Sequence, residues 1–159
     1  MIGIKTNKGY HRVIECMDEA EEKNAIIEFF KVINELKPSI IGGYNSANFD
    51  WHWIFERCNI LGIDPKKICR SLHPNHSFTR KDGMLKLANE VENFTQTSIW
   101  GYNVIDIIHA VRRAQAINSS IKAAGLKYIT KYINAEAPDR VYIDHLDIGP
   151  FYTKKKNFG

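Results

Sequence analysis

Apolar and polar positions alternate with helical period over an early stretch of the chain. The apolar residues recur at i, i+3, i+4, i+7 and i+10: Ile26, Phe29, Phe30, Ile33 and Leu36. This spacing predicts an amphipathic helix over about 19–36. Asp18 and Glu21 have the spacing of a capping box at its start, and Pro38 ends it.

The pattern then changes period twice. Residues 39–44 (SIIGGY) predict a short buried strand, and apolar positions at helical spacing predict a second helix from near Asp50 to Gly62. Before the first helix, two β-prone runs within 2–16 flank Asn7-Lys8-Gly9 and predict a hairpin. Helix, strand and helix in succession indicate an α/β layered fold.

The second half of the chain gives a weaker pattern. Residues 64–98 are polar and interrupted by proline and glycine, which suggests an insertion or an extended hairpin packed on the main sheet. A strand is predicted over 99–105, with a helix after it from Ile107, and another helix over 120–133. The tail from Val141 onward contains a possible further strand.

Composition limits the class of protein. The 159 residues are 44% hydrophobic, which suits one domain, 1–159, with a core of ordinary size. The chain has no long apolar run and no signal-peptide pattern, and its three cysteines suit a reducing compartment. We therefore expect an intracellular protein, cytoplasmic or nucleoid-associated, with no membrane partner. A net charge of +4 permits a polyanionic partner without requiring one.

The stretch GGYNSANFDWHWIFERC, residues 42–58, places Asp50 where the predicted strand gives way to the predicted helix. An aspartate at that boundary has two possible roles. It can cap the helix by accepting hydrogen bonds from the free amides of the first turn, or it can serve as an active-site ligand. The two roles do not exclude each other.

This stretch resembles the second exonuclease motif of family B DNA polymerases. In that family a strand leads through Gly-Tyr-Asn into Asn-Phe-Asp, and a helix that ends in arginine follows; here these are Gly43-Tyr44-Asn45, Asn48-Phe49-Asp50 and Arg57. Farther along, Val104-Ile105-Asp106-Ile107-Ile108 and the segment from Gly125 to Ile133 are similar to a later strand end and helix of the same domain. The resemblance covers about residues 19–145.

The resemblance implies an incomplete ribonuclease-H-like α/β fold, with a mixed sheet flanked by helices, from a 3′→5′ proofreading domain that works in DNA replication. It implies hydrolysis of phosphodiesters with two divalent metals, Mg²⁺ or Mn²⁺, with Asp50 holding one of them. The implied partners are single-stranded or primer-template DNA and the polymerase (nucleotidyltransferase) domain of the same parent chain, which is cellular or virus-encoded. The alternative is a non-catalytic, exonuclease-like module that serves as a scaffold or DNA-holding surface.

Two-metal chemistry requires several carboxylates, and the other motifs of the family are incomplete here. The family's first motif is Asp-x-Glu on the first strand, and no aspartate occurs before residue 18. Tyr102-Asn103-Val104-Ile105-Asp106 has the letters of the third motif, Tyr-x-x-x-Asp, but its β-prone context differs from the helix that this motif requires. Asp106 is thus a second candidate catalytic acid, and we expect the missing acids to lie outside this chain, which would leave it nearly inactive alone.

The residues around Asp50 suggest contacts to DNA. Asn45 and Asn48 either stabilise the turn by bonding their own backbone or contact a DNA strand. The resemblance favours Asn45 for such a contact with DNA. Tyr44 and Phe49 are aromatic and able to stack on a base; we expect Phe49 in the core and leave Tyr44 open. Cys69, His73 and His76 lack a fourth zinc ligand, and Lys154–Lys156 is typical of a solvated tail.

Overall fold

The computed structural model describes residues 1–69, 78–87, 90–139, 141, 143–144 and 146–150. Contacts divide the chain into two units, residues 1–124 and 125–159, and each is described by itself. Within the described ranges, no helix has the length and apolar character needed to cross a membrane. His73, His76 and the lysines at 154–156 lie outside the described residues.

The first unit begins with the predicted hairpin and helix. Strands β1 (Ile2–Lys5) and β2 (His11–Ile14) pair antiparallel, and Gly9 has a φ of 88° in the turn between them. Helix α1 spans Glu19–Leu36, and the side chain of Asp18 accepts a hydrogen bond from the backbone N–H of Glu21 at 3.0 Å. The N-cap at Asp18 is thereby confirmed, because this bond provides a partner for an amide that the helix itself leaves unpaired. The Glu21 side chain accepts from the N–H of Met17 at 2.9 Å, one residue before the position that a capping box requires.

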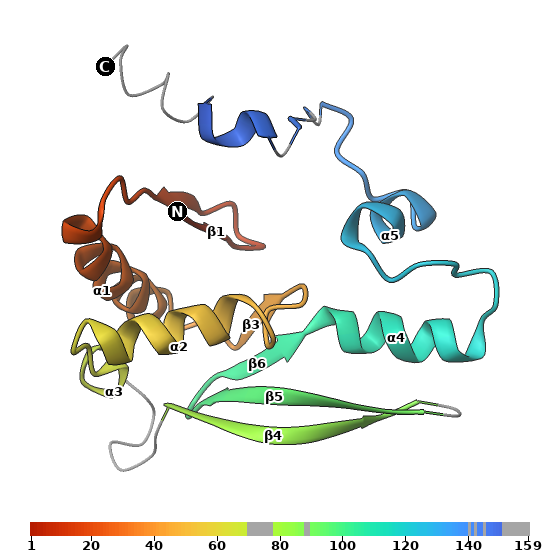
Figure 1. The fold of residues 1–159 in the computed structure, drawn as a ribbon, viewed down its shortest axis with the longest axis horizontal. Helices are drawn as coiled ribbons and strands as arrows, with labels where there is room; N and C mark the ends of the chain where they lie inside the picture. Colours follow the sequence, from red (N-terminus) through yellow and green to blue (C-terminus); the bar gives the residue numbers. More distant parts are fainter. Residues whose placement is uncertain (70–77, 88–89, 140, 142, 145, 151–159) are drawn as a thin grey trace. The chain divides into compact units, whose positions relative to one another are not determined.

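A parallel strand pair forms the centre of the site described below. Strand β3 (Ile40–Gly43) leads into helix α2 (Asp50–Ile60), and strand β6 (Asn103–Asp106) leads directly into helix α4 (Ile107–Ile117). The two strands pair in parallel with Gly43 opposite Asp106. The labelled ribbon in Figure 1 shows β6 continuing into α4. The predicted strand 39–44 therefore pairs with the later part of the predicted strand 99–105.

Between these elements the chain forms a short helix and a long antiparallel hairpin. Helix α3 spans Pro65–Ile68, and strands β4 (Phe78–Lys86) and β5 (Val91–Ile99) pair along their full lengths. The ladder runs from Phe78 opposite Ile99 to Lys86 opposite Val91. This hairpin lies in the later part of the polar region 64–98, in which an insertion or extended hairpin was expected.

Two sequence expectations about the strands require correction. The predicted strand 99–105 is two elements, because β5 ends at Ile99 and β6 starts at Asn103. Gly101, with a φ of 93°, turns the chain between them, a conformation that glycine adopts without steric cost. An isolated antiparallel bridge joins Ile99 and Tyr102, the residues on either side of this turn. The described strands therefore form three two-stranded sheets, where one mixed sheet was expected.

The core of the first unit lies between α1, α2 and the base of the β4–β5 hairpin. Phe30 is fully buried, and its ring centroid lies 5.3 Å from that of Phe29 and 5.6 Å from that of Phe78. Trp51 of α2 joins the same cluster, 5.8 Å from the ring of Phe78. These aromatic contacts fix the rotation of α2, and therefore determine which of its residues face outward at its start.

The second unit has one regular helix, α5 (Leu126–Tyr132), among its described residues, together with helical residues 146–150. The predicted helix 120–133 was too long at its start. Gly125 stands at the N-cap, and Asn118 accepts hydrogen bonds from the N–H and the hydroxyl of Ser120, which favours a turn over a helix. The possible tail strand is wrong for residues 141, 143 and 144, which lie in no strand; within this unit no described strand is present to pair with them.

Candidate functional site

The site is built on the loop of residues 44–49, which joins β3 to α2 and is called the motif loop below. Because β3 and β6 are parallel, their carboxyl ends meet at one edge, and ligand sites in α/β sheets form at such edges. Asp106 ends β6, and Asp50 follows the motif loop. The charge of Asp106 contributes to a raised pKa of the Asp50 carboxyl group, after the larger effect of desolvation. Asp50 and Asp106 therefore each follow or end a strand of the same parallel pair.

Just before the motif loop, Gly43 lies so close to Ser46 that only glycine fits at this position. A Cβ atom on Gly43 would lie 2.5 Å from both Cβ and Oγ of Ser46, and Ser46 is buried. Asn45 follows with a φ of 57°, the left-handed region that asparagine tolerates better than most residues. Gly43 and Asn45 of the motif therefore both have a backbone reason for their presence.

Gly43→Ala is expected to destabilise the first unit by about 1–3 kcal/mol, the usual cost of forcing extra volume into a packed site. Gly42→Ala provides the matched control, because its added Cβ would meet only Ile107 Cδ1, at an ordinary 3.8 Å. Urea denaturation of both variants and the unmutated chain measures the difference. Equal stability of the two variants would contradict the close approach of Gly43 to Ser46.

The Asp106 carboxylate binds the backbone of the motif loop. Its Oδ1 accepts the N–H of Asn45 at 2.8 Å, and its Oδ2 accepts the N–H of Ala47 at 2.8 Å. Oδ1 also accepts the N–H of Ile108 at 3.2 Å, so Asp106 is the N-cap of α4 as well. Three backbone amides thus converge on one carboxylate from elements about 60 residues apart in the chain. These contacts give Asp106 a role in holding the loop, whatever else it does.

Asp50 is the first residue of α2, and its position differs from that of a cap. The N-cap residue is Phe49, which makes no side-chain capping hydrogen bond, so the capping hypothesis for Asp50 is wrong. Asp50 is exposed at the edge where β3 and β6 end. Desolvation by the surrounding protein raises the pKa of its carboxyl group above the ordinary 3.8; its own backbone N–H opposes the shift, and the charge of Asp106 adds to it.

Asp50→Asn is expected to stabilise the chain slightly near neutral pH. Below 3.8 the carboxyl is protonated in the folded and the unfolded chain, so it makes no difference. As pH rises through the interval between 3.8 and the raised folded pKa, the unfolded chain releases its proton first, and stability is lost. The substitution removes that loss, which is at most about 0.5 kcal/mol because water screens an exposed group.

Denaturation curves of the variant and the unmutated chain at about pH 7 and about pH 3 test this prediction, and the gap between them should close at the lower pH. A variant that is less stable than the unmutated chain near pH 7 would contradict it, because that result indicates a lost capping contact.

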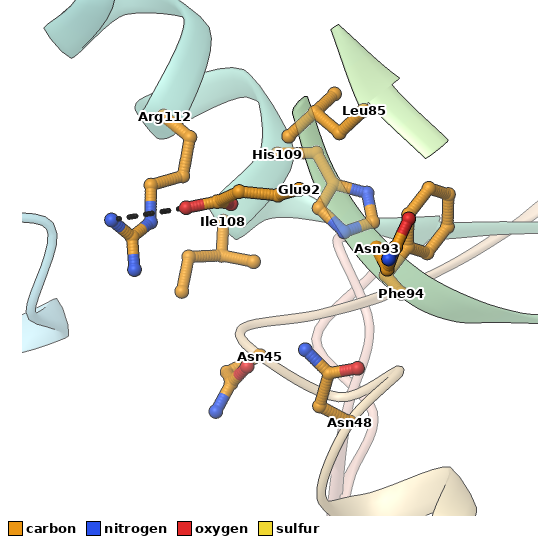
Figure 2. A pocket seen from close by; sticks show the side chains of 9 residues that line it. All are labelled: Asn45, Asn48, Leu85, Glu92, Asn93, Phe94, Ile108, His109 and Arg112. Atoms are coloured by element: carbon orange, nitrogen blue, oxygen red, sulfur yellow. Dashed lines mark ion pairs between the residues drawn. The ribbon is translucent and has the colours of Figure 1, made fainter. Parts of the chain in front are cut away.

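A small pocket lies between the motif loop, α4 and β5. Figure 2 shows Asn45 and Asn48 of the loop on one side and the ion pair between Arg112 and Glu92, at 3.5 Å, on the other. Its volume of about 50 Å³ suits one or two water molecules. The complete lining is Asn45, Asn48, Leu85, Glu92, Asn93, Phe94, Ile108, His109 and Arg112. Asn45 and Asn48 are both exposed, so they lie at the rim of this pocket.

The two aromatic residues of the motif have different environments. Tyr44 is half-buried, its hydroxyl donates a hydrogen bond to the carbonyl of Ala124, and burial raises the pKa of its phenol. Phe49, which we expected in the core, is 70% exposed. The cause is the rotation of α2: Trp51 points into the aromatic cluster, and Phe49 and Trp53 therefore face outward next to Asp50.

Arg80 is a residue of this site that sequence reasoning missed. It lies on β4, and its Nη2 donates to the carbonyl of Ala47 at 2.9 Å. Its Nη1 lies 2.9 Å from Nδ1 of His52, and its guanidinium carbon lies 5.9 Å from the ring centroid of Phe55. Burial lowers the pKa of Arg80, and the carboxylates of Glu56 and Asp82 oppose that shift. Sequence alone offered no signal for Arg80, because its partners lie about 30 residues away.

The arginine of the motif helix has a structural partner. Arg57 donates from Nε to Oε1 of Glu22 at 2.7 Å, and its Nη2 pairs with Oε2 of the same carboxylate. Glu22 is a buried residue of α1. Arg57 therefore joins α2 to α1 and neutralises a buried charge, and this pair raises the pKa of Arg57.

The described residues do not by themselves fit a two-metal centre. Among residues 1–69, 78–87 and the other described ranges, no group of three or more His, Cys, Asp or Glu side chains is placed to hold a metal. Asp50 is exposed, whereas both oxygens of Asp106 accept backbone hydrogen bonds. Hard divalent cations prefer several oxygen ligands, so a complete centre needs carboxylates beyond those described.

Comparison with known proteins shows one family match over most of the chain. Residues 3–128 match the family described as DNA polymerase family B, exonuclease domain. The matched range includes the motif loop, Asp50, the β4–β5 hairpin and Asp106.

Individual relatives share shorter or more divergent regions. The chain is 32% identical to DNA polymerase 2 of Aeropyrum pernix over 74 residues, which are 46% of this chain and 9% of that protein. It is 42% identical to the catalytic subunit of DNA polymerase epsilon from Aspergillus fumigatus over 50 residues, 31% of this chain and 2% of the relative. It is 21% identical to the DNA polymerase of Phaeocystis pouchetii virus over 141 residues, 82% of this chain and 13% of the relative. The chain thus spans a small part of the length of each relative.

Proposed function

Since this chain belongs to the exonuclease domain family of family B DNA polymerases, we propose that it forms part of a ribonuclease-H-like 3′→5′ proofreading exonuclease, in which Asp50 binds a catalytic divalent metal. One observation carries this proposal. The motif aspartate is exposed at the carboxyl edge of the parallel β3–β6 pair, directly after a loop with two exposed asparagines. The full protein then includes a polymerase domain in the same polypeptide.

The proposed metal is Mg²⁺ or Mn²⁺, because carboxylate oxygen is the ligand type that both prefer. Such ions polarise a phosphodiester and activate water. Asp50 supplies one ligand, and the remaining carboxylates come from residues beyond those described. The raised pKa of Asp50 is consistent with this role, since a nearby cation favours the ionised form that desolvation disfavours.

The proposed substrate is the single-stranded 3′ end of DNA. Asn45 and Asn48 are exposed at the rim of the pocket and present amide groups to a DNA strand. Tyr44, the first residue of the motif loop, supports the loop through the hydrogen bond from its hydroxyl to the carbonyl of Ala124. Arg112, half-buried across the pocket and paired with Glu92, provides a cationic group near the same rim. Amide and guanidinium groups are ordinary partners of phosphate and sugar oxygens.

The chain is expected to bind single-stranded DNA weakly, with marked salt dependence and little sequence preference, because phosphate contacts release counterions. Asn48→Ala should lower the affinity, and Asn59→Ala, an exposed asparagine near the far end of α2, is the matched control. Titration of a fluorescently labelled oligonucleotide at low and moderate salt measures both effects. Affinity that does not change with salt, or equal affinities of the two variants, would count against a strand at this rim.

A further inference from the structure

The peptide groups of the motif loop are held from two sides. The N–H of Ala47 donates to Asp106 at 2.8 Å, and the carbonyl of the same residue accepts from Arg80 at 2.9 Å. Asp106 comes from the end of β6, and Arg80 comes from β4 of the hairpin. Two charged side chains of opposite sign therefore form hydrogen bonds to the backbone of Ala47, one to its N–H and one to its carbonyl. Asp106 also accepts from the N–H of Asn45.

The loop needs such support because its backbone is unfavourable by itself. Asn45 has a φ of 57°, which costs free energy for a residue other than glycine, and Ser46 and Ala47 are buried without belonging to a helix or strand. Buried peptide groups require hydrogen-bond partners. Hydrogen bonds to ionised groups are the stronger kind, so Asp106 and Arg80 are well suited to maintain this conformation.

Ala47 stands three residues before Asp50, and the backbone N–H of Trp51 donates to the carbonyl of Ser46 at 2.8 Å. The first turn of α2 therefore continues directly from the part of the motif loop that Asp106 and Arg80 bind. We propose that Asp106 and Arg80 are positioning residues, which fix the direction of the Asp50 carboxylate by holding the motif loop between them. This inference rests on the function proposed above, and it gives Asp106 a role through the backbone, with no metal bound to its own oxygens.

The competing explanation for Asp106 is that it only caps α4 through the N–H of Ile108. Asp106→Asn separates the two roles. Asparagine is as good an N-cap as aspartate. With its Oδ1 in the capping position, its NH2 group replaces the oxygen that accepts from Ala47, and an NH2 group cannot accept that bond. Asp18→Asn is the matched control, because Asp18 caps α1 and makes its capping bond to Glu21 at 3.0 Å without touching the loop.

Backbone NMR of the unmutated chain and the two asparagine variants directly tests the hydrogen bond between Ala47 and Asp106. In the unmutated chain we expect a scalar coupling across the hydrogen bond between the Ala47 amide nitrogen and the Asp106 carboxyl carbon. In Asp106→Asn that coupling should vanish, and the Ala47 amide should exchange with solvent about tenfold faster, as the loss of one charge-assisted bond implies. Asp18→Asn should leave both unchanged. Unchanged Ala47 exchange in a folded Asp106→Asn chain would overturn the inference.

Arg80 gives an independent test from the other side of the loop, and it also decides the matter if Asp106→Asn does not fold. Arg80→Lys keeps the charge but loses the fork that reaches both Ala47 and His52. Lys81→Gln, on the neighbouring exposed position of β4, is its control. Faster exchange of the loop amides in Arg80→Lys, but not in Lys81→Gln, supports the inference, and identical exchange in both overturns it.

Affinity for a labelled single-stranded oligonucleotide provides the functional readout in the same variants. We expect severalfold weaker binding by Asp106→Asn and Arg80→Lys, and no change in the two controls, because only the first pair displaces Asn45 and Asp50. An unmutated chain that does not bind the oligonucleotide would refute the proposed function. The NMR result on the hydrogen bonds from Asp106 and Arg80 to the motif loop would still stand. If both Asp106→Asn and Arg80→Lys bind the oligonucleotide normally and their loop amides exchange at the normal rate, the positioning role of Asp106 and Arg80 is refuted.

Discussion

Asp50→Asn in the polymerase polypeptide to which we assign this segment is expected to slow degradation of single-stranded DNA from its 3′ end by at least about a hundredfold. The substitution preserves size and removes the negative charge that a divalent metal requires. Among the described residues Asp50 is the exposed acid at the β3–β6 edge, and Asp106 is engaged with backbone amides. A gel assay on 5′-labelled oligonucleotide with Mg²⁺ or Mn²⁺ measures the loss.

Asp64→Asn is the matched control for this experiment, because Asp64 is an exposed aspartate that caps α3 by accepting from the backbone N–H of Lys66. It should retain full activity. The 159 residues alone are expected to digest DNA slowly or not at all, since the described residues provide fewer ligands than two hard cations need. Vigorous digestion by the chain alone that depends on Asp50 would show that the missing acids lie within it, with Asp106 the first to re-examine.

Phe30→Ala is expected to lower the free energy of unfolding by about 3–5 kcal/mol, a large share of the stability of a domain of this size. Phe30 is fully buried and packs edge-on against Phe29 and Phe78, so its removal leaves a cavity where α1 meets the hairpin base. Phe49→Ala is the matched control. Phe49 is 70% exposed, and its loss should change stability by no more than about 0.5 kcal/mol.

Urea denaturation followed by tryptophan fluorescence compares the two phenylalanine variants, since Trp51 lies in the same aromatic cluster. Similar losses of stability in both would place Phe49 in the core after all. Such a result would contradict the rotation of α2 on which the exposure of Asp50 depends.

Local patterns predicted most of the regular structure correctly. The N-cap at Asp18, the apolar face of α1 and the turn at Gly9 each involve residues that are close in sequence. The errors occurred where the local signal was ambiguous. A β-prone run over 99–105 is compatible with one strand, and the turn at Gly101 divides it in the folded chain. Similarly, the apolar spacing over 120–133 concealed the break at Gly125.

For the site, sequence placed Asp50 at the join of a strand and a helix and identified the family motif, because motif residues are contiguous. It misjudged Phe49, since the side of α2 that faces the core is selected by Trp51 packing against Phe29 and Phe78. It also offered no means to detect Arg80. A lone arginine in a polar hairpin is ordinary, and its significance comes only from the Ala47 carbonyl that it meets.

The sequence by itself determined the family, the order of the first helix, strand and helix (α1, β3 and α2) and the aspartate that follows the β3 strand, because these depend on residue types at short, fixed spacings. Only the tertiary structure decided how that aspartate is presented. Asp106 and Arg80 lie 59 and 33 residues from Ala47, yet they bind the N–H and the carbonyl of that one residue. Hydrogen bonds of this kind form only once β6 has paired with β3 and the hairpin has packed on α2, so no local pattern encodes them.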